Sequence, residues 1–143
     1  MSVLAFDFGE KRIGVAVGDL EIGIAHPLET IVAEGNEARF ESIAKLITEW
    51  KPTQLVVGLP SHMDGTEHEL SRLSRRFARR LEGRFNLPAV LVDERLSSDE
   101  ASLSLNEAGI RGKGQKIMID QVAAQHILQS HFDSQQRDHR HVA

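Results

Sequence analysis

Three acidic side chains in this sequence occupy positions where a charge is costly. Asp7 interrupts the apolar run of residues 3–8, Glu94 follows the apolar run of residues 89–92, and Asp120 lies within a predicted helix. An unpaired ionised carboxylate in an apolar environment is strongly destabilising, so acidic residues usually avoid such positions. Each of the three therefore needs a structural or a chemical explanation.

Asp120 is the most informative of the three. At 100° per residue it falls within about 60° of five residues that are mostly small or apolar, namely Lys116, Ala123, Ala124, Ile127 and His131. We expect this face to pack on a sheet, with glutamines on the far side of the helix at Gln121, Gln125 and Gln129. A carboxylate would then stand in the middle of a sheet-packing stripe.

Considered separately, the three residues could be a strand-end turn, an ion pair of Glu94 with Arg95, and a helix cap. One explanation covers them all: the carboxylates converge and bind Mg²⁺ or Mn²⁺, because hard divalent cations take oxygen ligands. Two such ions about 3.5–4 Å apart would clamp the attacking and leaving oxygens of a phosphodiester displacement. We therefore predict a metal-dependent nuclease with Asp7, Glu94 and Asp120 as catalytic residues and metal ligands.

Basic residues accompany the carboxylates along the chain. They stand at Lys11, Arg12, Arg95, Lys113 and Lys116, the last two at the end of a glycine-rich segment that we expect to be a loop at residues 109–115. Such side chains would contact phosphates beside the scissile bond. The alternatives are local charge balance for the first three and a plain surface loop for the last two.

A further six arginines, at residues 72, 75, 76, 79, 80 and 84, lie within thirteen positions that contain one acidic residue, Glu82. Four of them, at 72, 75, 76 and 79, lie opposite an apolar helical stripe at residues 70, 73, 77 and 81. A solvated helix face explains this pattern, and so does contact with nucleic acid.

The periodicity of apolar residues predicts an α/β fold. Strands are predicted over residues 3–8, 12–19, 22–31, 54–57 and 89–92. Helices are predicted over residues 36–50, with Asn36 as the N-cap and Lys51-Pro52 as the stop, and over 66–84, 97–106 and 116–132. Short connections make the first three strands an antiparallel meander, with Pro27 placing the third at an edge. We expect a mixed five-stranded sheet with helices on both faces in a single domain at residues 1–132, and a disordered tail at residues 133–143.

Composition restricts the class of protein. The chain has 143 residues, 41% hydrophobic and 27% charged, which is typical of one globular domain. It contains no cysteine, so disulfides and thiolate metal sites are excluded. No apolar run approaches the roughly 20 residues of a membrane span, and the first residues do not resemble a signal peptide. We expect a cytoplasmic protein, and a monomer or weak homodimer.

Net charge hides an asymmetry between the two parts of the chain. The formal net charge is −4, yet residues 1–69 carry 12 acidic and 5 basic side chains, and residues 70–143 carry 9 and 12. The balances are therefore −7 and +3. Such clustering of basic residues points toward an anionic partner.

Several segments resemble the YqgF family, also called RuvX, in family order across nearly the whole chain. They are DFGEKRIGVA at residues 7–16 with Asp19, AHPLETI at 25–31, VVGLP at 56–60, MDGTE at 63–67, DERLS at 93–97 and DQVAA at 120–124 with ILQ at 127–129. Departures are Gly18 in place of serine, Ser61-His62 in place of Leu-Asn, and Ser97-Ser98 in place of Thr-Thr.

The resemblance implies a ribonuclease H-like fold and a Holliday junction resolvase-like nuclease that processes the 5′ end of pre-16S ribosomal RNA. It also implies that Asp7, Glu94 and Asp120 hold the metal. His62 lies in a loop that would help to position substrate, so its replacement is expected to alter substrate preference. The expected partner is structured RNA or branched DNA.

Other classes of function compete with this interpretation. The glycines after Asp7 also resemble the phosphate loop of actin-like kinases and chaperones, but those proteins need two such domains and this chain has the length of one. A four-way DNA junction resolvase and a non-catalytic rRNA-binding module stay open as alternatives.

Overall fold

The computed structural model describes residues 1–9, 12–32, 35–59, 69–93 and 113–142. One sheet has the strand order β3-β2-β1-β4-β5. The strands are β1 (Ser2–Phe8), β2 (Arg12–Asp19), β3 (Ile24–Val32), β4 (Gln54–Leu59) and β5 (Ala89–Asp93). β1–β2 and β2–β3 pair antiparallel, whereas β1–β4 and β4–β5 pair parallel. The predicted mixed sheet with an antiparallel meander is confirmed.

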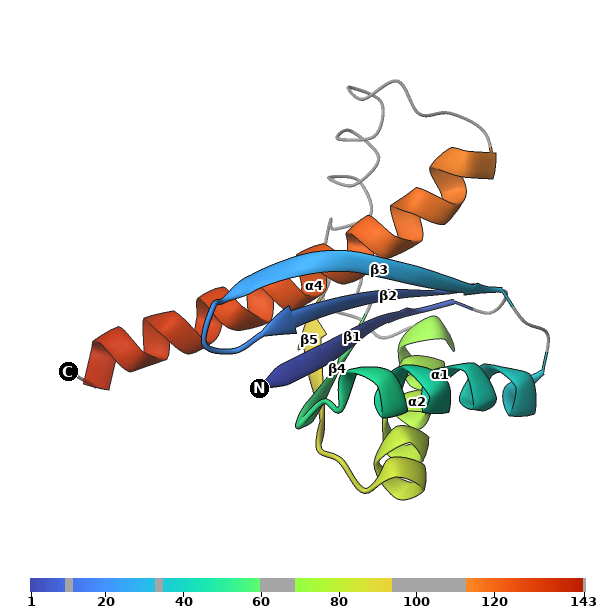
Figure 1. Cartoon of the computed structure of the whole chain (residues 1–143), viewed down its shortest axis with the longest axis horizontal. Helices are drawn as coiled ribbons and strands as arrows, with labels where there is room; N and C mark the ends of the chain where they lie inside the picture. Colours follow the sequence, from blue (N-terminus) through green and yellow to red (C-terminus); the bar gives the residue numbers. More distant parts are fainter. Residues whose placement is uncertain (10–11, 33–34, 60–68, 94–112, 143) are drawn as a thin grey trace.

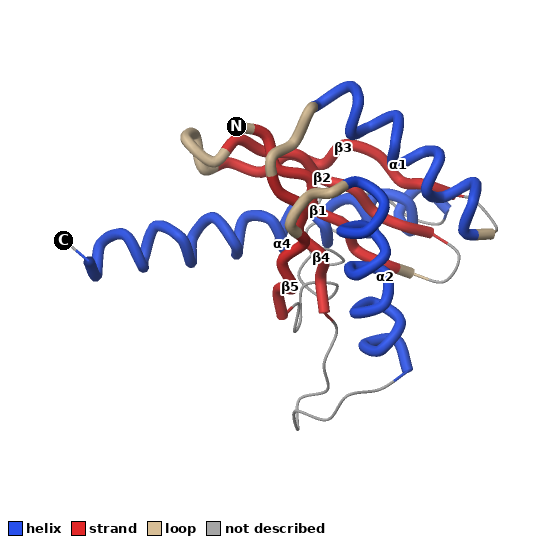
Figure 2. The backbone as a smooth tube through the Cα atoms, turned by 90° about the horizontal axis from the view of Figure 1, so that it is seen from below, coloured by secondary structure: helices blue, strands red, loops and turns tan. Residues whose placement is uncertain are grey.

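Helices cover both faces of this sheet, as predicted (Figure 1). α1 (Asn36–Trp50) and α2 (Glu69–Phe85) lie on one face, and α4 (Lys113–Val142) crosses the other (Figures 1 and 2). Within the ranges described, no helix is both long and apolar enough to cross a membrane. The predicted helix at residues 97–106 and the predicted helix start at Thr66 fall outside the described residues.

Strand alternation divides the core into two clusters. Leu4 and Phe6 of β1 are fully buried against the side chains of α1 and α2. Val3 and Ala5, which point the opposite way, are fully buried against α4. Asp7 continues the alternation of Val3 and Ala5, so its side chain lies on the α4 face of the sheet.

The ends of α1 show how backbone conformation sets helix boundaries. Asn36 was predicted to be the N-cap, but it is the first helical residue, and Gly35 with φ 91° precedes it without a side-chain cap. Glycine adopts that positive φ readily because it has no side chain, so the residue before the helix is Gly35 and not Asn36. The predicted stop at Lys51-Pro52 is confirmed: Lys51 is left-handed, and its N–H donates to the carbonyl of Ile47 at 2.8 Å.

α4 is longer at both ends than predicted. It begins at Lys113, so Lys113 lies in the helix and not in the loop predicted over residues 109–115, and it continues past Phe132 to Val142 where a disordered tail was predicted. A single Gly114 costs a helix only about 1 kcal/mol. Residues 115–142 contain neither proline nor glycine, so the sequence supplies no stop signal.

Two glutamines of α4 cover the edge strand β3. Gln129 accepts a hydrogen bond from the Ala25 N–H at 3.0 Å and donates to the Gly23 carbonyl at 2.9 Å. Gln125 donates to the Ala25 carbonyl at 3.0 Å. The prediction that these side chains lie on the far side of the helix is therefore wrong for both. These glutamines bond backbone groups that would otherwise be free to pair with a strand of another molecule.

His131 generates a prediction about stability. The side chain is 6% exposed, its Nε2 lies 3.2 Å from Oε1 of Gln54, and burial lowers the pKa of the imidazole from the ordinary 6.5. The unfolded chain therefore binds a proton more readily than the folded chain. We expect the free energy of unfolding to be highest above pH 6.5 and to fall as the pH drops below it, measured by urea unfolding across that range.

Replacing the imidazole should remove this contribution. In the His131→Gln variant the decline in unfolding free energy below pH 6.5 should be shallower than in the wild type. His26, an exposed histidine on β3, offers the matched variant His26→Gln, which should keep the wild-type decline. Equal slopes for wild type and His131→Gln would contradict the interpretation.

Candidate active site

The register of β1 and β2 brings the first predicted carboxylate next to the path of α4. Asp7 pairs directly with Gly14 in the antiparallel ladder. Directly opposed residues point to the same face of a sheet, so the Asp7 side chain and the open side of Gly14 share the α4 face. Asp7 is half-buried there, at the carboxyl end of β1.

Asp120 reaches the same place because α4 contacts β2 at Gly14 without an intervening side chain. A Cβ built on Gly14 would lie 1.9 Å from the carbonyl oxygen of Asp120 and 2.3 Å from its carbonyl carbon. No residue other than glycine fits this contact without moving the helix. Ala123, Ala124 and Ile127 then pack on the sheet, as the helical periodicity predicted.

Arg12, one of the predicted phosphate-contacting residues, lies in the described part of the chain. Arg12 precedes Gly14 by two residues on β2, so both belong to the α4 face. Its Nε donates to Oδ2 of Asp120 at 2.6 Å. The side chains are 37% and 19% exposed, so the ion pair stands at the boundary between core and solvent. Asp7, Arg12 and Asp120 thus belong to one face at one end of the sheet.

The other predicted site residues fall largely outside the described part of the chain. Glu94, Lys11, His62 and Arg95 lie in segments that are not described, and the side chains of Lys113 and Lys116 are likewise not described. The backbone of both lysines belongs to the first turns of α4. Among the described residues, no three His, Asp or Glu side chains are grouped closely enough to hold a metal ion.

Sequence reasoning missed Gly14 as a determinant of the site. The signal was present, because a glycine inside a strand often marks a close backbone approach. Gly18, on the same face of β2, makes a second such approach: its Cβ would lie 2.6 Å from the ring of Phe132. Both glycines fix the position of α4.

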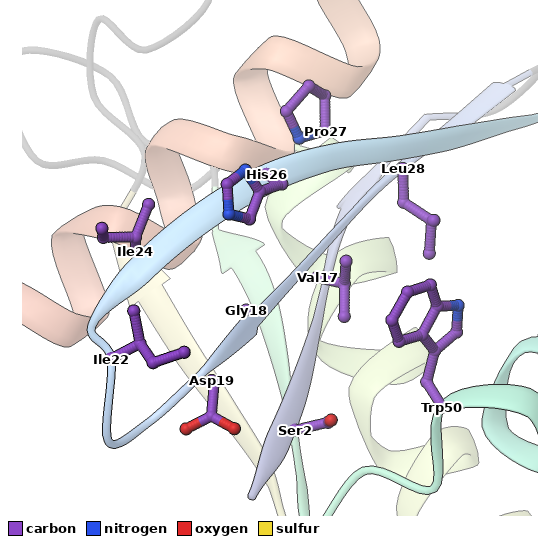
Figure 3. A pocket seen from close by; sticks show the side chains of 10 residues that line it. All are labelled: Ser2, Val17, Gly18, Asp19, Ile22, Ile24, His26, Pro27, Leu28 and Trp50. Carbon is purple, nitrogen blue, oxygen red and sulfur yellow. The ribbon is translucent and has the colours of Figure 1, made fainter.

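A cavity of about 410 Å³ lies away from these carboxylates, on the face of the β2–β3 hairpin that carries α1 (Figure 3). Its wall is formed mainly by apolar side chains, including Val17, Ile24 and Trp50, with Asp19 at one end. The Asp19 carboxylate accepts a hydrogen bond from the Glu21 N–H at 2.8 Å, which lowers its pKa and fixes it in the hairpin turn. A single carboxylate with this structural role does not provide for phosphodiester chemistry.

Comparison with known proteins defines the class. The family model described as "RuvX: Holliday junction resolvase" matches residues 1–134. Relatives named "Putative pre-16S rRNA nuclease" include one from Methylobacillus flagellatus, 68% identical over 92% of this chain and 90% of its own. Another, from Nitrosospira multiformis, is 61% identical over 92% of this chain and 87% of its own.

Solved structures show the fold. The structure of Thermus thermophilus RuvC aligns with a TM-score of 0.56 at 14% identity, over 95% of this chain and 96% of its own. Fowlpox virus resolvase, solved with Holliday junction DNA, aligns with a TM-score of 0.57 at 13% identity, over 94% and 98%. These likenesses confirm the predicted ribonuclease H-like fold.

Fold and family together define a nuclease that hydrolyses phosphodiester bonds, as the sequence predicted. The chain belongs to the RuvX family, which confirms the resemblance to that family.

The contact at Gly14 predicts the effect of one methyl group. Gly14→Ala should push α4 from β2, lowering both the melting temperature and nuclease activity, because overpacking typically costs about 1–3 kcal/mol. Gly83→Ala is the matched control: an added Cβ there meets no atom within 4 Å, and alanine is the better helix former. Thermal unfolding of both variants checks this; a Gly14→Ala protein as stable as Gly83→Ala would contradict the steric argument.

Proposed function

We propose that this protein is a divalent-metal-dependent nuclease that processes the 5′ end of pre-16S ribosomal RNA. The observation that supports the proposal is that Asp7 and Asp120 belong to one face at one end of the sheet, with Arg12 paired to Asp120. Two carboxylates and one guanidinium on this face form a donor set suited to both a cation and a phosphate.

The residues present fit Mg²⁺ or Mn²⁺. Asp7 and Asp120 supply hard oxygen ligands from a strand and from the helix packed on it, and Glu94 is proposed as the third ligand. Support for Glu94 comes from Val92, two residues earlier, which packs in the same α4-face cluster as Val3 and Ala5. When bound, the cation would activate water as the nucleophile and stabilise charge on the phosphate oxygens.

Arg12 is proposed to have two roles in this site. Its Nε donates to Asp120 and holds that carboxylate in place on the partly exposed side of the site. The guanidinium carries further N–H groups, which suit the oxygen of a phosphate beside the scissile bond. We propose Lys11, His62, Arg95, Lys113 and Lys116 as further substrate contacts, the two last because they belong to the first turns of α4.

RNA is the proposed substrate because relatives that are 58–68% identical carry the name "Putative pre-16S rRNA nuclease". Such a role implies the cytoplasm, where ribosomal precursors are processed. A four-way DNA junction is the second candidate, favoured by the description of the family model. A direct cleavage assay distinguishes between these two candidate substrates.

Removing a carboxylate charge tests the site. Asp7→Asn and Asp120→Asn should each lower the rate of RNA cleavage by about 100-fold or more, because losing a metal ligand removes several kcal/mol of transition-state stabilisation. Asp133→Asn is the matched control, since Asp133 is an exposed carboxylate of the same helix. Cleavage of a labelled pre-16S 5′ leader would be measured at saturating Mg²⁺. Wild-type rates for Asp7→Asn would refute the assignment.

Metal and substrate dependence provide a second test. Cleavage should stop after chelation with EDTA and return with Mg²⁺ or Mn²⁺, whereas Ca²⁺, which has looser geometry, should support it poorly. The pre-16S leader should be cleaved faster than a four-way DNA junction of equal length. Faster cleavage of the junction would replace the proposed substrate, and activity that survives EDTA would exclude the proposed cofactor.

A further inference from the structure

A second hollow lies at the same end of the sheet as the carboxylates but on the opposite face. Phe8 follows Asp7 on β1, so the two side chains point to opposite faces. Phe8 lines a cavity of about 150 Å³ between the beginning of α1 and α2. Figure 1 shows these two helices on the face of the sheet away from α4. The remaining lining residues are Asn36, Phe40, Leu73, Arg76, Phe77 and Arg80.

The chemistry of this lining is cationic and aromatic. Arg76 and Arg80 belong to α2, the helix that carries the six clustered arginines. No ion pair joins either of them to another described residue. Among the residues that the structure describes, none of those lining the cavity is acidic. The wall consists of the partly buried Phe8 and Leu73, backed by the packed ring of Phe77, 4.9 Å from that of Phe8.

Arginines already lie over the neighbouring rings. The guanidinium of Arg84 stands 4.4 Å from the ring centroid of Phe40, and that of Arg39 stands 5.7 Å from the centroid of Phe8. These contacts reinforce the positive potential around an apolar floor. An anion with a flat apolar part complements such a surface.

We propose that this cavity binds one nucleotide of the single-stranded RNA that reaches the carboxylate site, an inference that rests on the proposed function. Arg76 and Arg80 contact its phosphate, and the base lies against Phe8 and Leu73. Asn36 provides an amide that hydrogen-bonds a base edge. The cavity selects an unpaired nucleotide, because a duplex presents only base edges and keeps the faces of its bases stacked.

The affinity of arginine variants tests the phosphate contact. Arg76→Ala should weaken binding of a single-stranded RNA by about tenfold, since hydrogen bonds to charged groups are the strong ones. It should also reduce the slope of log K against log salt by about 0.7, the value for one phosphate of a single strand. Arg79→Ala is the matched control, because it removes the same charge from an exposed position of the same helix outside the cavity.

Abasic nucleotides test the base contact. In a scan that replaces one nucleotide at a time in an RNA with a 5′ single-stranded extension, the wild type should lose affinity at one position. Arg76→Ala should abolish this position dependence, and Arg79→Ala should keep it. Fluorescence anisotropy in the Asp7→Asn background measures binding without cleavage. Arg80→Ala, at a half-buried position, serves as a second variant once its melting temperature has been shown to match the wild type.

The outcomes separate this inference from the proposed function. If the wild type cleaves RNA but Arg76→Ala binds and responds to salt as Arg79→Ala does, the nucleotide site is refuted and the nuclease assignment stands. If cleavage fails while the position-dependent affinity is seen and requires Arg76, the nucleotide site stands alone. Equal effects of Arg76→Ala on a blunt duplex, or tighter binding of an acidic peptide than of RNA, would also overturn the proposal.

Discussion

The direct contact of α4 with β2 is the constraint on which the arrangement of this protein depends. Helices usually rest on a sheet through their side chains, but Gly14 and Gly18 leave no Cβ between them and α4, and Ala16 lies between the two. The helix meets Gly14 at Asp120 and Gly18 at Phe132, about three turns apart. Contact at two such points fixes both the distance of α4 from the sheet and its rotation, so the carboxylate at position 120 is placed beside β2 and is largely shielded from solvent.

The charge at this contact is balanced by local pairing. Arg12 lies on the same face as Gly14, and its Nε donates to the Asp120 carboxylate at 2.6 Å. Removing one partner would leave an uncompensated charge on a partly buried side chain, which is more destabilising than losing an exposed ion pair. The same pairing holds the carboxylate on the face of the sheet to which Asp7 also belongs. The contact at Gly14 therefore positions the backbone of Asp120, and the ion pair with Arg12 positions its side chain.

Much of the fold could be predicted because its signals are local. Alternation of apolar residues identified all five strands, and Asp7 and Asp120 stood out because they contradict an otherwise consistent pattern. The failures have tertiary causes. Gln125 and Gln129 are polar, so periodicity assigned them to solvent, whereas they bind the backbone of the edge strand β3. Likewise, the start of α1 depends on the positive φ of Gly35, which residue types alone did not distinguish from capping by Asn36.

Alternation along a single strand also explains how one end of the sheet can have two chemical characters. On β1, Asp7 turns toward α4 and its small residues, and Phe8 turns toward the arginines and aromatic rings of α1 and α2. The two faces are separated only by the thickness of a sheet, yet one gathers oxygen ligands and the other guanidinium groups. A net charge averaged over the chain conceals this difference between the two faces. The fold thus places carboxylates and guanidinium groups on opposite faces at one end of the sheet, and on the α4 face Arg12 pairs with Asp120.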